Sequence, residues 1–171
     1  MEHKTDKTED FHEEITLERL ENLDDYKVAD GYKNVVDWKV VADKELNIGK
    51  VRGLVASKEL GRVLYLDILV EKSLCSDDES KLYILVPIGL AKFNTDDKTV
   101  SINSIDADTF VSYPRYDGSD IRLDYERLLY GYYSKHPNIE LKPYIGRQKA
   151  DYDNEMLYDK KIMHGSPLMG I

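Results

Sequence analysis

The sequence predicts a mainly β protein: a small open β-barrel with one or two short helices and flexible segments at its N- and C-terminal ends. From Val35 onward, short runs rich in β-branched and aromatic residues alternate with turn residues at intervals of roughly ten, a pattern typical of small barrels and sandwiches. The one clear helical stripe comes after these runs. Neither end of the chain carries a sustained apolar pattern, so we expect only the middle to form a core.

The predicted strands are bounded by turn residues. They cover residues 35–42, 48–57, 62–70, 82–86, 88–93 and 99–102. The run 62–70 is apolar in both alternating registers, which favours a central strand that is buried on both faces. Glycine inside a strand indicates a bulge or a corner, as expected at Gly49. Pro87 donates no ladder hydrogen bond and divides two runs, so it predicts a bend or a sheet edge.

Several residues in these runs are predicted to be structural. Trp38 has valine pairs on both sides and is expected to be buried at the start of the barrel. Tyr65 and Leu66 lie in the middle of the predicted central strand, where a charge would be poorly tolerated. Gly89 is a structural position together with Pro87, in the second half of the barrel.

The chain divides into three parts. Residues 1–14 are almost entirely polar or charged and are predicted to be a disordered acidic tail, because they cannot recover the ordering entropy by burial. The domain is expected to span residues 15–134, with Thr16 capping a short helix that carries leucines on one side and covers a sheet edge. Residues 135–171 lack periodicity and contain scattered prolines and glycines, which predicts an extended or mobile tail.

A helix is predicted after the strands, with Asp124 as its N-cap residue. Its apolar residues recur at helical spacing and form one stripe: Tyr125, Leu128, Leu129, Tyr132 and Tyr133. We expect this stripe to close the barrel, with a weak homodimer in addition. The chain has 13 tyrosines. Tyr125, Tyr132 and Tyr133 are candidates for a partner-binding face, because tyrosine combines a wide apolar contact with a polar tip.

Charge and hydropathy exclude some classes of partner. The net charge is -9, and most of it lies in residues 1–25, which carry three Lys/Arg and ten Asp/Glu. Without an excess of clustered cations, the chain lacks the cationic surface that binds a nucleic-acid backbone or an anionic membrane. Its longest apolar runs, such as residues 84–90, are far shorter than the roughly 20 residues of a transmembrane helix. With one cysteine and no apolar N-terminal stretch, we expect a soluble cytoplasmic protein without direct membrane insertion.

The sequence motifs of catalysis, cofactor binding and metal binding are missing. The histidines form no cluster with metal-ligand spacing: His3, His12, His136 and His164. Neither a nucleophile elbow nor a phosphate-binding loop is present. Asp151, Asp153 and Glu155 imitate the opening of a calcium loop, but Met156 stands where that loop requires glycine. We therefore expect a non-enzymatic protein with no cofactor and no metal ion.

Two blocks of the sequence resemble the PRC-barrel family. The first comprises residues 38–41 (WKVV), 48–51 (IGKV) and 63–67 (VLYLD). The second comprises residues 85–91 (LVPIGLA) and 100–105 (VSINSI), with Phe110 and Pro114-Arg115. The second block is similar to the reaction-centre H-chain branch, that is, to the cytoplasmic domain of the photosynthetic reaction-centre H subunit without its transmembrane helix. The likeness extends over residues 33–133.

The resemblance implies an open PRC-type barrel, a short helix near residues 106–111, and a role in interaction instead of turnover. An acidic segment stands where the H chain has its transmembrane helix. Lys58 and Gly61 stand where the H chain places carboxylates that pass protons toward a quinone, although Asp67 matches an acidic position inside the strand. The ribosome maturation factor also contains a PRC barrel, but it carries a second RNA-processing module that this chain is too short to hold.

These features give a ranked set of functional hypotheses. The first is a protein-interaction or stress-associated adaptor module that binds an unidentified protein or membrane complex. The alternative is an accessory factor of photosynthetic or other membrane electron transfer. A ribosome-assembly adaptor and a small-ligand binder rank lower, and the ligand binder requires a polar pocket at the barrel mouth.

Overall fold

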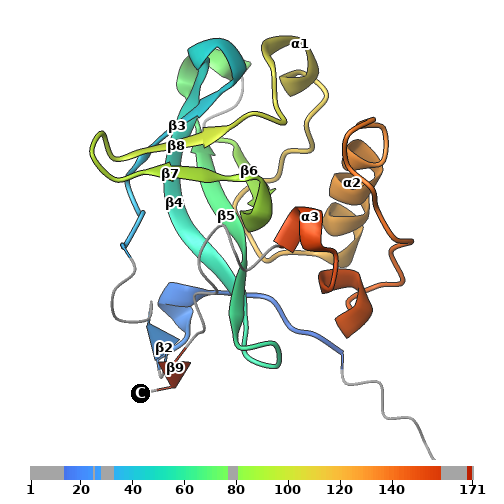
Figure 1. The fold of residues 1–171 in the computed structure, drawn as a ribbon. Helices are drawn as coiled ribbons and strands as arrows, with labels where there is room; N and C mark the ends of the chain where they lie inside the picture. Colours follow the sequence, from blue (N-terminus) through green and yellow to red (C-terminus); the bar gives the residue numbers. More distant parts are fainter. Residues whose placement is uncertain (1–13, 25, 28–32, 77–80, 159–168, 171) are drawn as a thin grey trace, which may run out of the picture.

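The computed structural model describes residues 14–24, 26–27, 33–76, 81–158 and 169–170, and these form a mixed β-sheet with short helices packed beside it (Figure 1). The seven-stranded main sheet has the order β6-β5-β4-β3-β8-β7, and β1 also pairs with β4. Its strands are β1 Glu18–Arg19, β3 Lys39–Ala42, β4 Asn47–Ser57, β5 Arg62–Val70, β6 Tyr83–Pro87, β7 Lys92–Asn94 and β8 Thr99–Ile102. A small second sheet joins β2 Tyr26–Lys27 to β9 Met169–Gly170. The mainly β prediction is confirmed.

The main sheet is open. β6 and β7 stand at the two ends of the strand order, and no pairing joins them within the described residues. Neighbouring strands are antiparallel except β3 and β8, which pair in parallel from Lys39↔Thr99 to Ala42↔Ile102. The longest pairing joins β4 to β5 through the turn before Gly61, whose φ of 61° lies in the left-handed region that favours glycine.

Most predicted strands agree closely with the observed ones. β5 pairs on both sides and is almost entirely buried, so its central position is confirmed. The run 35–42 pairs only from Lys39, after Asp37 with its left-handed backbone (φ 68°). The run 88–93 is divided, because the 3-10 helix η4 (Ile88–Leu90) turns the chain before β7. Pro87 therefore ends an edge strand at a bend, as predicted.

The N-terminal segment, residues 14–24, covers a sheet edge as a strand and not as the helix that was predicted. β1 pairs with β4 through Glu18↔Ala56 and Arg19↔Val55. The pairing of β3 with β4 stops at Lys50, which leaves backbone groups of β4 for β1 to pair with. Thr16 caps no helix; its hydroxyl donates to Glu59 Oε1 at 2.5 Å.

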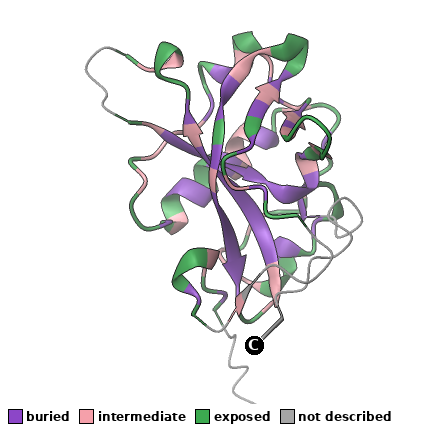
Figure 2. Ribbon diagram, turned by 90° about the vertical axis from the view of Figure 1, so that its left-hand side faces the viewer, coloured by how far each residue is buried: buried purple, intermediate pink, exposed green. Residues whose placement is uncertain are grey.

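The residues predicted to be structural lie in the core or at close backbone contacts. Trp38, Tyr65 and Leu66 are buried, and Figure 2 shows how burial follows the strands. A Cβ on Gly49 would overlap the carbonyl oxygen of Leu69 on β5, and one on Gly89 would overlap the backbone near residue 157. Both glycines therefore permit close packing that a larger residue would prevent.

α2 and α3 lie beside one flank of the sheet (Figure 1). The α-helices are α1 Ala107–Phe110, α2 Leu123–Tyr133 and α3 Glu155–Tyr158, and the other 3-10 helices are η1 Leu20–Asn22, η2 Asp43–Glu45, η3 Lys72–Leu74 and η5 Lys149–Tyr152. α1 occupies the position where the resemblance implies a short helix, and its N-cap Asp106 accepts the Thr109 N–H at 2.8 Å. α2 begins two residues earlier than predicted, with Arg122 and not Asp124 at its N-cap.

The segment after α2 differs from the expected extended tail. Residues 149–158 form η5 and α3, and they bury Tyr152, Leu157 and Tyr158. Two short helical turns give no periodic pattern in the sequence, but their aromatic side chains fill space between α2 and the sheet. Residues 1–13 of the predicted acidic tail, and residues 159–168 and 171, lie outside the described residues.

Candidate functional site

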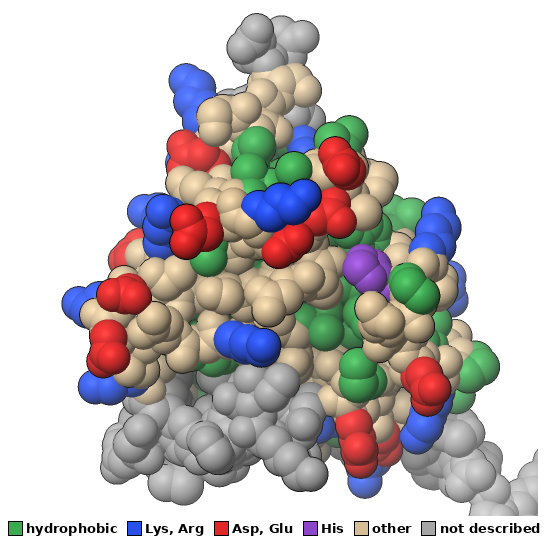
Figure 3. Space-filling model, turned by 45° about the horizontal axis from the view of Figure 1, so that its top comes forward, with side chains coloured by type: hydrophobic (Ala, Val, Ile, Leu, Met, Phe, Trp, Pro, Cys, Tyr) green, Lys and Arg blue, Asp and Glu red, His purple; other side chains and the backbone are tan. Residues whose placement is uncertain are grey.

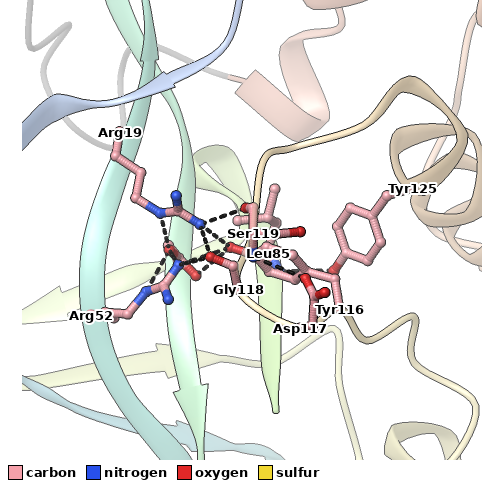
Figure 4. A network of polar contacts seen from close by, with 9 residues as sticks. Arg19, Arg52, Leu85, Tyr116, Asp117, Gly118, Ser119 and Tyr125 are labelled. Atoms are coloured by element: carbon pink, nitrogen blue, oxygen red, sulfur yellow. Dashed lines mark hydrogen bonds and ion pairs between the residues drawn. The ribbon is translucent and has the colours of Figure 1, made fainter. Parts of the chain in front are cut away.

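Asp67 is a charged residue in the middle of the apolar strand β5, and it is 0% exposed. Its Oδ2 accepts hydrogen bonds from Arg19 Nε at 3.0 Å and from Arg52 Nε at 2.8 Å. Its Oδ1 accepts from the Tyr116 hydroxyl at 2.8 Å. Figure 4 shows the guanidinium groups of Arg19 and Arg52 turned toward the same point of this polar network. Because a buried carboxylate is stable only when it is paired and hydrogen-bonded, these donors account for its position.

The partners of Asp67 come from separate parts of the chain. Arg19 belongs to β1, Arg52 to β4, and Tyr116 to the loop after α1. Arg19 Nη2 also donates to the carbonyl oxygen of Gly118 at 2.6 Å. Gly118 has a φ of 83°, and a Cβ there would overlap a neighbouring tyrosine ring, so glycine allows the loop to come this close. The site therefore fastens the N-terminal segment and this loop to the sheet.

The charges in the site favour an ionised Arg19 and a neutral Tyr116. Burial alone lowers the pKa of Arg19, but hydrogen bonds with Tyr116 and Asp67 outweigh it and raise that pKa overall. Burial raises the pKa of Tyr116, and the Asp67 carboxylate raises it further, because a second negative charge beside the first is unfavourable. The Arg52 guanidinium also lies over the Tyr83 ring, 3.9 Å from the ring centroid.

Glu126 on α2 is a second buried carboxylate. Its Oε1 accepts from the Tyr65 hydroxyl at 3.0 Å and the Tyr152 hydroxyl at 2.9 Å, and its Oε2 accepts from Arg147 Nε at 2.7 Å. The hydroxyls of Tyr65 and Tyr158 share a hydrogen bond of 2.6 Å. Burial, together with the nearby Glu126 charge, raises the pKa of Tyr65 well above its ordinary value. This cluster joins β5, α2, η5 and α3.

Tyr125 and Tyr133, predicted as candidates for partner binding, are instead internal. Both are buried. The Tyr125 hydroxyl accepts the Leu85 N–H at 3.0 Å, and the hydroxyls of Tyr133 and Tyr113 lie 2.7 Å apart. These bonds attach α2 to β6 and to the loop after α1, so the two residues serve the core. The stripe was predicted to close the barrel; the sheet is open, and this part of the stripe packs into the core beside it.

One row of residues, on α2 and in the turn after it, is exposed or only half-buried. Leu128 is 62% exposed, in contrast to its predicted place in the covered stripe. Tyr132, one turn later, is half-buried against the ring of Tyr113, at 4.7 Å between centroids. His136, one turn further, lies 6.0 Å from the Tyr132 ring. We call Leu128, Tyr132 and His136 the α2 ridge, and Figure 3 shows hydrophobic side chains beside the purple histidine on this face.

No protein-family model and no curated protein matches the chain. A fold does not define a function, so the arrangement of the residues is what bears on it. Among the described residues, no helix has both the length and the apolar character needed to cross a membrane.

The sequence pattern that imitates a calcium loop has another role. The Asp151 carboxylate accepts the backbone N–H groups of Ile145 at 2.6 Å, Gly146 at 2.9 Å and Gln148 at 2.8 Å. It therefore shapes the loop that presents Arg147 to Glu126. In the part of the chain that the structure describes, no group of three or more His, Cys, Asp or Glu side chains is arranged to hold a metal ion. Of the histidines, only His136 lies in that part.

Sequence reasoning missed most of these polar contacts. It noted Asp67 as an acidic residue inside a strand, but not its arginine partners. Glu126 gave a signal that was not used, because it is a charge placed next to Tyr125 on the buried side of an amphipathic helix. Arg19 and Arg147 gave none, since nothing in their neighbourhood indicates which distant carboxylate each would meet.

Proposed function

We propose that this chain is a non-enzymatic, PRC-type β-barrel protein that works as a protein-interaction or stress-associated adaptor module in the cytoplasm. The order of its sequence motifs and the position of α1 support the family relationship to the reaction-centre H chain. The oxygens of both buried carboxylates are engaged by arginine or tyrosine donors. This supports a structural role for the two acids. A site of interaction is therefore expected at the surface and not at these carboxylates.

The α2 ridge is the observation that carries the adaptor function. Leu128 leaves most of its apolar side chain in water, and covering such a side chain is favourable by about 1.5–3 kcal/mol. Tyr132 and His136 are half-buried beside it, and their polar atoms, the Tyr132 hydroxyl and His136 Nε2, are themselves buried. Interface cores are enriched in aromatic residues and depleted of charge, and the ridge has this composition. A partner that covers the ridge would bury Leu128, its most exposed residue.

The test is affinity capture from the native organism, with the purified chain as bait and with soluble and membrane fractions applied separately. We expect the wild-type bait to retain a partner in near-stoichiometric amount. Leu128→Asp should lose it, because the variant replaces the most exposed apolar side chain of the proposed contact with a charge. Ile145→Asp is the matched control: Ile145 is 65% exposed and lies on the loop beside Asp151, outside the ridge.

Three results would count against the proposal: no retained protein, equal retention by all baits, or a loss that Ile145→Asp causes equally. A partner found in the membrane fraction, and released by Leu128→Asp alone, would favour the accessory role in membrane electron transfer over the soluble adaptor. Circular dichroism of each bait would show that the substitutions leave the fold intact.

A further inference from the structure

A surface pocket lies where β3, β4 and β5 come together with η3, and its volume is about 470 Å³. Among the residues that the structure describes, four lysines line it, Lys39, Lys50, Lys72 and Lys81, against two acidic residues, Asp37 and Glu71. The chain as a whole carries a net charge of -9. The described lining therefore carries a local excess of positive charge on an acidic protein.

The register of the sheet places two of these lysines directly opposite each other. Lys39 on β3 pairs with Lys50 on β4, and like charges in such a cross-strand pair are destabilising. Lys50 Nζ has one counter-charge, Asp37 Oδ1 at 3.4 Å. Lys39, Lys72 and Lys81 make no ion pair with any residue that the structure describes. Residues that destabilise the fold locally, as two opposed lysines do, are expected mainly at functional sites.

The remaining lining gives the pocket a defined floor and wall. Gly49 brings the backbone of β4 against that of β5, where a Cβ would overlap the Leu69 carbonyl oxygen. The side chain of Leu69 is half-buried and, with Val70, contributes an apolar wall. Pockets of roughly 300–1,000 Å³ that combine apolar walls with a few charged groups are typical of small-molecule sites.

We propose that this pocket binds a small anion of the polyphosphate or phosphate-ester class, with two or more negative charges. Lysine binds phosphate as a compact point charge, and a divalent anion would offset the two excess positive charges. An extended nucleic-acid backbone does not fit, because it needs a long cationic surface and the rest of the chain is acidic. The site is separate from the α2 ridge and does not depend on the adaptor function.

Calorimetric titration with pyrophosphate at constant ionic strength tests the proposal. We expect binding at one site in the wild type and a loss of affinity of about tenfold or more in Lys39→Gln/Lys81→Gln, since both lysines then lose their charge-assisted contacts. The control is Lys92→Gln/Lys135→Gln, which removes the same charge from two exposed lysines outside the pocket. The control should bind as the wild type does.

A thermal readout separates a binding role from a structural one. Without anion, Lys39→Gln should melt at the same temperature as the wild type or higher, because it relieves the repulsion with Lys50. With pyrophosphate, the melting temperature of the wild type should rise, and that of the double pocket variant should rise less. The proposal is overturned if the wild type does not bind, if all variants bind equally, or if Lys39→Gln alone lowers the melting temperature without anion.

Discussion

Arg19 Nε lies 3.0 Å from Asp67 Oδ2 although the two residues are 48 positions apart in the sequence. Arg19→Met keeps an unbranched side chain and removes the charge, so the N-terminal segment loses its main polar anchor. Arg52 and Tyr116 still satisfy the carboxylate, and we therefore expect a loss of about 1.5–3 kcal/mol in the free energy of unfolding, the range for a hydrogen bond to a charged group. Urea denaturation followed by circular dichroism measures it.

The control for this variant is Arg122→Met. Arg122 pairs with Asp124 at the surface, with side chains 75% and 65% exposed, and exposed pairs of this kind contribute about 0–1 kcal/mol. Equal losses in the two variants would show that the buried position of the Arg19 pair gives it no advantage.

Tyr65→Phe tests the Glu126 cluster. The substitution keeps the ring and removes the hydroxyl that donates to Glu126 at 3.0 Å, so one acceptor site of a buried carboxylate loses its donor. The expected loss in the free energy of unfolding is about 1.5–3 kcal/mol. Tyr130→Phe is the matched control, because the Tyr130 hydroxyl has no hydrogen-bond partner among the described residues. A loss as large in Tyr130→Phe would contradict the argument.

Leu128 and Leu129 are neighbours on α2 with opposite environments, 62% and 3% exposed. Leu129→Asp places a charge in the core and should cost more than about 3 kcal/mol, so we expect an unfolded or partly folded protein by circular dichroism. Leu128→Asp should remain folded. Sedimentation velocity then reports on the predicted weak homodimer, which Leu128→Asp should dissociate if the α2 ridge forms its interface. A Leu129→Asp variant that is folded and simply monomeric would show that α2 belongs to an interface and not to the core.

Alkaline pH should unfold the protein and ionise its buried tyrosines in one step. Burial raises the pKa of Tyr65, Tyr113 and Tyr158 well above the ordinary value of 10.0. A raised pKa in the folded state means that this contribution to stability is complete below about pH 10 and declines as the pH rises from there toward the folded pKa. Tyrosinate absorbance and circular dichroism should therefore change together above pH 10. Titration of all tyrosines near pH 10 in a protein with native circular dichroism would oppose this prediction.

The sequence predicted correctly those elements whose burial or backbone geometry follows from their own residue types. β5 is apolar in both registers, and the structure buries it on both faces. Pro87 ends β6, and Gly49 allows a close backbone contact that a Cβ would prevent, as their residue types predict. In these places the residue type alone restricts the conformation, so no knowledge of distant partners was needed.

The differences arise where a distant partner decides the outcome. Residues 16–23 have leucines at helical spacing, but an unpaired edge of β4 is available, and pairing with it gives β1. Tyr152 and Tyr158 have no periodic context, and they are buried because Glu126 and Tyr65 lie opposite them. The opposition of Lys39 and Lys50 likewise depends on the register of β3 with β4, which shifts between Val40 and Val41.

The long sequence separations at Arg19 have a consequence for biosynthesis. Arg19 donates to Gly118, 99 positions later in the chain, whereas β4 and β5 pair across one short turn. Local pairings form early and distant ones late, so the ribosome releases the N-terminal segment long before its docking site is complete. During that interval the nascent hairpin carries an uncovered strand edge at Val55 and Ala56, and such an edge is open to pairing with another chain.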